Sequence, residues 1–188
     1  LENYEPDQKE DSLIEYEWAG EAIKHVGTVV HRCLQIIAEQ GLGFWDEQSI
    51  SNLQQSNRVL LTRLGVSEKE LDHANGQIHL ALSNIIADTR GQWILSEQHI
   101  DAKNEYALSG IYQGKVTNVV IDRTFIDADG VRWIVDYKTS RHEDEDIEAF
   151  LDQQQERYQQ QLEKYGTLFK EMEDKPVKLA LYFPLLQG

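Results

Sequence analysis

The hydrophobic residues in the first half of the chain recur at helical spacing. Apolar side chains return every three or four positions between about Trp18 and Gln40, and Gly41 follows as a stop signal. The same periodicity predicts a second helix over roughly 46–64 and a third over about 67–88. The first half of the chain is therefore predicted to be helical.

The periodicity changes after Gly91. Short runs rich in aromatic and β-branched residues then predict strands, at Trp93–Leu95, Tyr106–Ile111, Val116–Ile126 and Val131–Tyr137. A long helix over about 147–173 and a last strand over 177–183 follow. This order predicts an α/β (α+β) fold, with a central mixed sheet flanked by helices and an N-terminal helical part.

Composition narrows the class of protein. The 188 residues are 40% hydrophobic and include one cysteine, so neither a disulfide framework nor a cysteine-ligated iron–sulfur cluster is expected. No apolar run is long enough for a membrane span and no signal peptide is recognisable, so we expect no membrane partner and a cytoplasmic location. The acidic segment 1–17 is predicted to be a tail or linker end, and 18–188 a single domain, mainly helical over 18–90 and sheet-based over 91–188.

Two predicted strands end in aspartate on either side of a hairpin. The Asp129-Gly130 turn makes these strands antiparallel neighbours and places Asp122 opposite about Tyr137, with Asp136 diagonal to it. The two-residue period puts Asp136 and Lys138 on one face. Burying two carboxylates requires a cation, and oxygen ligands favour Mg²⁺ or Mn²⁺, with the Tyr137 carbonyl as a further ligand. The alternative is that these aspartates are ordinary turn or cap residues.

Three motifs in this sequence resemble those of RecB-type nucleases in the PD-(D/E)XK superfamily. Asp122-Arg123, the hairpin and Ile134-Val135-Asp136-Tyr137-Lys138-Thr139 resemble the nuclease signature. The segment 27–34 resembles the family's first motif, which maps the metal-ligating histidine onto His31. The segment 158–165 resembles the downstream helix motif, which maps onto Gln161 and Tyr165.

The resemblance implies a restriction-endonuclease-like core and a Mg²⁺- or Mn²⁺-dependent deoxyribonuclease that lacks an iron–sulfur cluster. It is closest to the nuclease domain at the C-terminus of UvrD/RecB-like helicase-nucleases of the exonuclease V β subunit type, which implies DNA and a helicase motor as partners in recombination and repair. Its implied metal ligands are His31, Asp122, Asp136 and the Tyr137 carbonyl. Lys138 is the implied catalytic lysine, acting with Asp122 and Asp136, and Gln161 and Tyr165 are implied substrate contacts.

Three further residues are weaker candidates for the site. Arg123 and Arg141 are candidate phosphate contacts, with surface salt bridging as the alternative for each. Glu97 lies where related proteins often carry an acid before the strands.

The net charge of −15 opposes the binding of a polyanion. The segment 115–141 differs from the rest of the chain, because it holds five basic residues against four aspartates. We therefore expect weak DNA affinity that depends on a metal and on an attached motor. Two alternatives stay open: a catalytically silent nuclease-like interaction module attached to a helicase, and a phosphoesterase that acts on small substrates.

Overall fold

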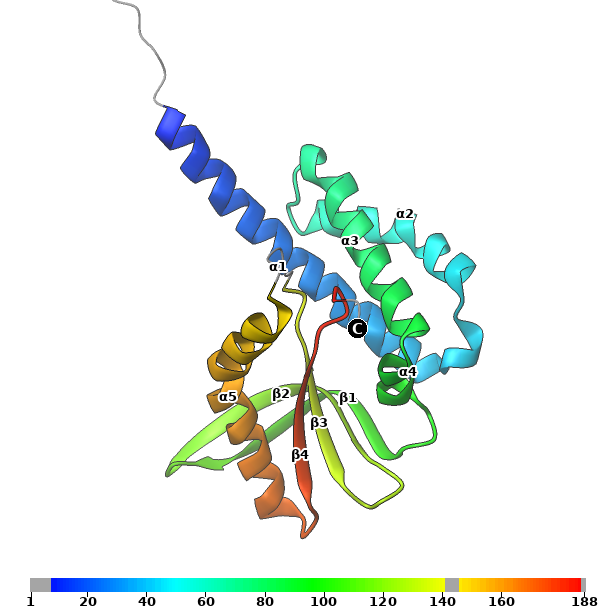
Figure 1. Cartoon of the computed structure of the whole chain (residues 1–188), viewed down its shortest axis with the longest axis vertical. Coiled ribbons are helices and arrows are strands. Elements are labelled where there is room, and N and C mark those ends of the chain that lie inside the picture. The colour runs from blue at the N-terminus through cyan, green and yellow to red at the C-terminus, as the bar shows by residue number, and fades with distance from the viewer. Residues whose placement is uncertain (1–7, 141–145, 187–188) are drawn as a thin grey trace, which may run out of the picture.

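The computed structural model describes residues 8–140 and 146–186 (Figure 1). Its elements, in chain order, are α1 (Gln8–Gln40), a short 3₁₀ helix (Leu42–Phe44), α2 (Glu47–Arg63), α3 (Glu68–Ala87), α4 (Thr89–Leu95), β1 (Ile100–Tyr112), β2 (Lys115–Ile126), β3 (Arg132–Tyr137), α5 (Ile147–Met172) and β4 (Val177–Tyr182).

The strands form one mixed sheet in the order β1-β2-β3-β4. The first two pairings are antiparallel and come from hairpins, whereas β3 and β4 are parallel and are joined through α5. Parallel neighbours require such a crossover, because a hairpin reverses the direction of the strand. The sheet and its flanking helices are those of the predicted α/β fold with an N-terminal helical part.

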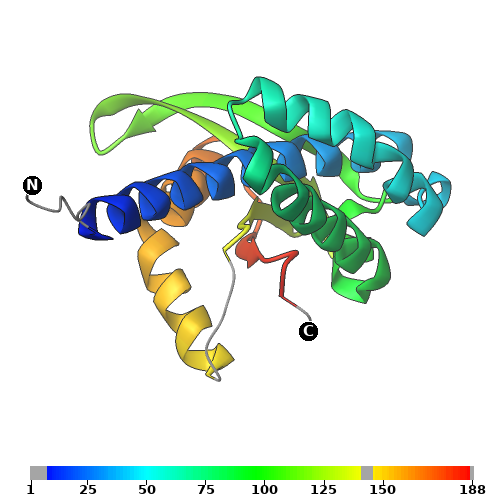
Figure 2. The ribbon, with the colours of Figure 1, turned by 90° about the horizontal axis from the view of Figure 1, so that it is seen from above.

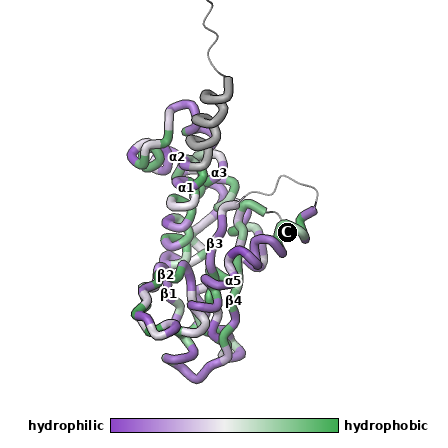
Figure 3. Tube along the Cα trace, turned by 90° about the vertical axis from the view of Figure 1, so that its left-hand side faces the viewer, coloured by the Kyte–Doolittle hydropathy of each residue, from purple (hydrophilic) through white to green (hydrophobic). Residues whose placement is uncertain are grey.

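Helices cover both faces of the sheet, so the apolar side chains fall into two clusters. The larger cluster joins α1 to α4 with Phe125, Val135 and Tyr137 from one face of the sheet. The smaller cluster joins α5 with Ile121 and Ile134 from the other face. Figure 2 shows α1 to α4 on one side and α5 on the other, and hydrophobic and hydrophilic residues alternate along these elements in Figure 3.

Two predicted boundaries were wrong. Helix α1 begins at Gln8, ten residues before the predicted start near Trp18. Segment 93–95 is the end of α4 and not a strand, since the Asp88 side chain accepts from the backbone N–H groups of Arg90 and Gly91 and starts a short helix.

The side chains of β2 change the face of the sheet on which they lie at Asp122. Ile121 packs in the α5 cluster, yet Arg123, two residues later, contacts backbone carbonyls of α4 and Ser96 on the opposite side. Residues two apart on a regular strand face the same way, so the alternation is interrupted here. On β1, Glu105 lies between the pairs that join Asn104 to Arg123 and Tyr106 to Ile121, and it has a left-handed φ of 45°. The sheet is therefore kinked where the candidate site lies.

Within the described residues, no helix is long and apolar enough to cross a membrane.

Candidate metal centre

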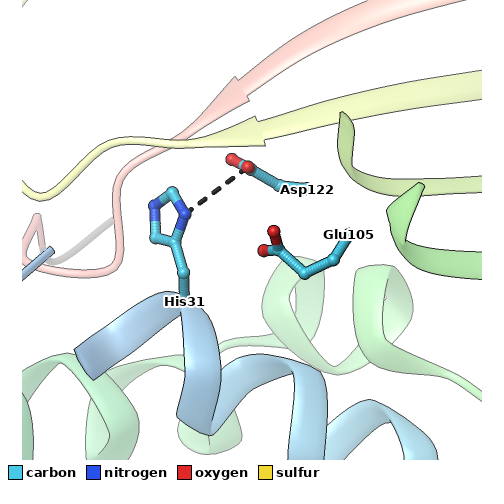
Figure 4. A group of neighbouring side chains, drawn as sticks. All are labelled: His31, Glu105 and Asp122. Atoms are coloured by element: carbon cyan, nitrogen blue, oxygen red, sulfur yellow. Dashed lines mark ion pairs between the residues drawn. The ribbon is translucent and has the colours of Figure 1, made fainter. Parts of the chain in front are cut away.

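Helix α1 presents His31 to the ends of β2 and β3. The His31 Nε2 atom lies 3.1 Å from the Tyr137 carbonyl oxygen, and Nδ1 lies 3.4 Å from Asp122 Oδ1 (Figure 4). One turn earlier, a Cβ atom on Gly27 would lie 3.0 Å from Thr139 Oγ1, so a glycine lets the helix approach the end of β3 this closely. This contact fixes the distance from which His31 reaches the strands.

Glu105 completes a three-residue group with His31 and Asp122. One ligand atom from each of these residues lies within 4.8 Å of the others, a spacing that is able to hold a metal ion. Figure 4 shows Glu105 and Asp122 pointing into the same space beside the His31 ring. Glu105 is absent from the predicted site because the predicted strand begins one residue later, at Tyr106. A hairpin turn at Gln113-Gly114 places position 105 opposite 122 and is the signal that would have found it.

Asp122 also joins the two strands after their ladder has ended. The last ladder pair at this end is Arg123 with Val135, and Asp122 Oδ2 then accepts the Tyr137 N–H at 2.7 Å. The register differs by one residue from the prediction, which had placed Asp122 opposite Tyr137. The aspartate nevertheless contacts Tyr137, because its side chain reaches along the strand to the backbone N–H.

Asp136 and Lys138 lie on the α5 face of β3, as the two-residue period predicts. Gln161 Nε2 donates to Asp136 Oδ1 at 2.8 Å and to the Tyr165 hydroxyl at 2.7 Å. Lys138 Nζ lies 2.6 Å from Asp136 Oδ2 and 3.9 Å from the centre of the Tyr158 ring. Asp136 Oδ2 is buried, and Lys138 is the positive charge that lies against it. Asp136 is not part of the His31–Glu105–Asp122 group.

The pKa values around the site reflect a concentration of negative charge. Burial raises the pKa of Asp136, the charge of Asp122 raises it further, and Lys138 only partly offsets this. Burial and the charge of Asp122 likewise raise the pKa of Glu105. Burial lowers the pKa of His31, but its hydrogen bond and charge interaction with Asp122 outweigh burial and leave the pKa raised. The three shifts show that an additional positive charge would be favourable here.

The residues present fit a divalent cation. The carboxylates of Glu105 and Asp122 and the imidazole of His31 lie close enough together to hold an ion, and the Asp136 carboxylate, whose pKa is raised in part by the charge of Asp122, lies nearby. Carboxylate and carbonyl oxygens suit Mg²⁺ and Mn²⁺, and an imidazole ligand is compatible with Mn²⁺. His31 Nε2 faces a backbone carbonyl, which is the usual arrangement for a metal-ligating histidine whose other nitrogen faces the ion.

Arg123 does not reach the solvent. Its side chain is 1% exposed, and its guanidinium donates to the carbonyl oxygens of Ile94 and Ser96 and to Asn104 Oδ1. Arg123 was predicted to contact a phosphate, and this prediction is corrected because the kink at Asp122 turns the side chain toward α4. Arg141 lies outside the described residues. Glu97 lies against Gly41, where its carboxylate occupies the space of a Cβ atom, and it is not part of the His31–Glu105–Asp122 group.

This fold and site define a class of metal-dependent enzymes that act on phosphodiesters. The family model of the PD-(D/E)XK nuclease superfamily matches residues 9–187, so the chain belongs to this superfamily. None of the curated proteins matches the chain.

Proposed function

We propose that the chain is the Mg²⁺- or Mn²⁺-dependent deoxyribonuclease domain of a helicase-nuclease. The observation that carries this proposal is the convergence of His31, Glu105 and Asp122 beside the Asp136–Lys138 ion pair. These groups come from α1, β1, β2 and β3, and nothing in the fold alone requires three carboxylates to lie together. Superfamily membership supports phosphodiester hydrolysis as the reaction.

We assign the ion to His31, Asp122 and Asp136, with Glu105 as an additional carboxylate. The carbonyl oxygen of Tyr137 accepts the His31 Nε2–H, which directs Nδ1 toward Asp122, and this carbonyl would be a further oxygen ligand for an ion. When bound, a divalent ion supplies a Lewis acid that polarises a phosphoryl oxygen and makes a bound water more acidic.

Lys138 and Gln161 act on the reacting groups. The Lys138 ammonium orients the attacking water and offsets the charge that develops on the phosphate, and Asp136 holds Lys138 in place. Water attacks phosphorus, the bond from phosphorus to the leaving oxygen breaks, and the leaving oxygen takes up the proton that the water loses. Gln161 and Tyr165 lie one helical turn apart and position the strand beside Asp136.

The biological setting is a proposal from the sequence resemblance. An exonuclease V-like domain in recombination and repair receives its DNA from a motor, which suits a chain with a net charge of −15. The compartment we propose is the cytoplasm.

The test uses the purified chain with linear single-stranded and double-stranded DNA. We expect cleavage in Mn²⁺ or Mg²⁺, none in EDTA, and a loss of at least about 100-fold in Asp136→Asn, which is nearly isosteric. Asp174→Asn, an exposed aspartate beyond α5, is the matched control and is expected to cleave like the wild type. Cleavage that persists in Asp136→Asn contradicts the assignment, and metal binding without any cleavage favours a silent interaction module.

A further inference from the structure

A basic groove runs between α5 and the hairpin formed by β1 and β2. It has a volume of about 870 Å³, and its lining includes Lys115, Arg157 and Lys164 but only one acid, Glu163. Volumes of roughly 300–1,000 Å³ are typical of ligand sites. Figure 1 shows α5 lying across the sheet while the hairpin extends beyond it to one side.

The three cations are available to a ligand. Lys115 and Arg157 are exposed and Lys164 is half-buried, and none of them forms an ion pair within residues 8–140 and 146–186. The chain as a whole has a net charge of −15, so a local excess of positive charge differs from the rest of it. A groove with an excess of two positive charges is therefore an anionic-ligand site rather than an average surface.

The groove leads to the candidate metal centre. Arg157, Gln161 and Lys164 follow each other at helical spacing on one face of α5, over about 10 Å of helix. Gln161 lines the groove and also donates to Asp136 Oδ1. A polymer bound along this face therefore passes beside Asp136.

The wall of the groove is held in place by a close contact. A Cβ atom on Gly110 of β1 would lie 2.6 Å from Leu168 Cδ2 of α5, so this glycine lets the hairpin lie directly against the helix. The ring of Tyr112 lies near the tip of the hairpin, with Lys164 Nζ 6.0 Å from its centre. Cations along a groove together with an aromatic ring form the usual combination for single-stranded nucleic acids, in which phosphates meet the cations and a base stacks on the ring.

We infer that this groove binds a single nucleic-acid strand through its phosphates and guides it to Asp136. The inference rests on the proposed nuclease function and adds the path of the substrate. Arg157, Lys164 and Lys115 contact successive phosphates, and Tyr112 provides a stacking surface for a base.

The test measures the affinity of the full chain for a labelled oligothymidylate of about 20 nucleotides, longer than typical single-strand site sizes, in EDTA as a function of salt. We expect Arg157→Gln/Lys164→Gln to flatten the slope of log K against log salt by about 1.4, since each contact contributes about 0.7. If the variant and the wild type bind equally at high salt, the variant therefore binds about 25-fold more weakly than the wild type at a tenfold lower salt concentration. Glu163→Gln is expected to strengthen binding.

The matched control is Lys69→Gln/Lys170→Gln, which removes the same charge from two exposed lysines outside the groove. Equal losses in the groove variant and the control overturn the inference, and so does tighter binding of a duplex than of the single strand.

Hydrolysis of bis(p-nitrophenyl) phosphate in Mn²⁺ tests the metal centre separately, because this small ester does not span the groove. If the ester is cleaved but the groove variant binds like the wild type, only the groove fails. If groove-dependent binding occurs without any hydrolysis, only the nuclease proposal fails.

Discussion

Asp122 bonds to the backbone N–H of Tyr137 through one carboxylate oxygen and faces His31 Nδ1 with the other. A single side chain therefore closes the end of the β2–β3 pairing and contributes to the candidate metal centre. These two roles respond differently to substitution, because the first needs only an acceptor oxygen whereas the second needs a negative charge.

Asp122→Asn and Asp122→Ala separate the two roles. The asparagine retains an acceptor for Tyr137, so we expect it to be more stable to urea than the alanine variant by about 1 kcal/mol. Both are expected to lose metal-dependent cleavage by at least about 100-fold, since the charge is lost in each. Isothermal titration with Mn²⁺ checks the metal affinity, and equal stability of the two variants would contradict the role in strand pairing.

Glu105→Gln tests the residue that the geometry adds to the site. It removes a carboxylate that lies near Asp122, so we expect weaker Mn²⁺ binding, by about tenfold or more, together with a metal-free protein that is at least as stable as the wild type. Titration calorimetry and thermal unfolding in EDTA measure these effects. Glu171→Gln, an exposed glutamate on α5, is the control and is expected to change neither quantity. Unchanged Mn²⁺ affinity in Glu105→Gln would remove this residue from the site.

The metal-free protein is expected to become less stable as the pH rises from 6 to 8. The pKa of His31 is raised in the folded state, so its contribution is complete below the unfolded value of about 6.5 and is lost as the pH passes the folded pKa. The pKa of Asp136 is also raised, so its ionisation opposes folding as the pH rises through that pKa. At the acidic end, the hydrogen bond from Arg132 lowers the pKa of Glu173, and its contribution is lost as the pH falls through that pKa. We therefore expect the greatest stability at mildly acidic pH.

Thermal unfolding measured from pH 4 to pH 8, with EDTA or with saturating Mn²⁺, checks this profile. Mn²⁺ is expected to reverse the decline above pH 6, because it replaces the proton of His31 as the positive charge of the site. His31→Gln is expected to show a smaller decline in EDTA. A melting temperature that rises between pH 6 and pH 8 without metal would contradict the sign of the His31 shift.

Arg123→Lys is expected to destabilise the fold rather than to weaken DNA binding. A lysine ammonium does not reproduce the fork that bonds to Ile94, Ser96 and Asn104, so buried carbonyl oxygens lose their donors. The expected cost is about 2–3 kcal/mol in urea unfolding. Oligonucleotide affinity, measured well below the melting temperature, is expected to match the wild type. A loss of affinity without a loss of stability would restore Arg123 as a phosphate contact.

The sequence predicts helices better than it predicts the details of the site. Periodic apolar residues locate α2, α3 and α5 within a residue or two, because each helix buries one face. The run Trp93-Ile94-Leu95 is too short for its period to decide between strand and helix, and the Asp88 cap decides it in the structure. His31 is found through the motif resemblance, since a histidine on an apolar helix face has no distinguishing pattern of its own.

The two errors at the site have different causes: Glu105 was missed because the predicted strand began at Tyr106, and Arg123 was misplaced because strand alternation is broken beside it. Strand reasoning assumes regular alternation and a fixed register, and the kink at Glu105 and Asp122 breaks the alternation on both strands. Arg123 is consequently turned into the interior while Glu105 is brought beside Asp122. Such a break depends on backbone conformation, including the left-handed φ of Glu105, which the residue types do not reveal.

The candidate site forms only together with the tertiary structure. His31 of α1 contacts the Tyr137 carbonyl, which lies 106 positions away in the chain. Gln161 of α5 contacts Asp136. The proposed ligands therefore converge only after α1 has packed against the sheet, and Gln161 of α5 then holds Asp136 from the other face. A nascent or partly unfolded chain has carboxylates but no assembled centre. Under the proposed function, DNA cleavage therefore requires the complete tertiary structure, and a cleavage assay also measures correct folding.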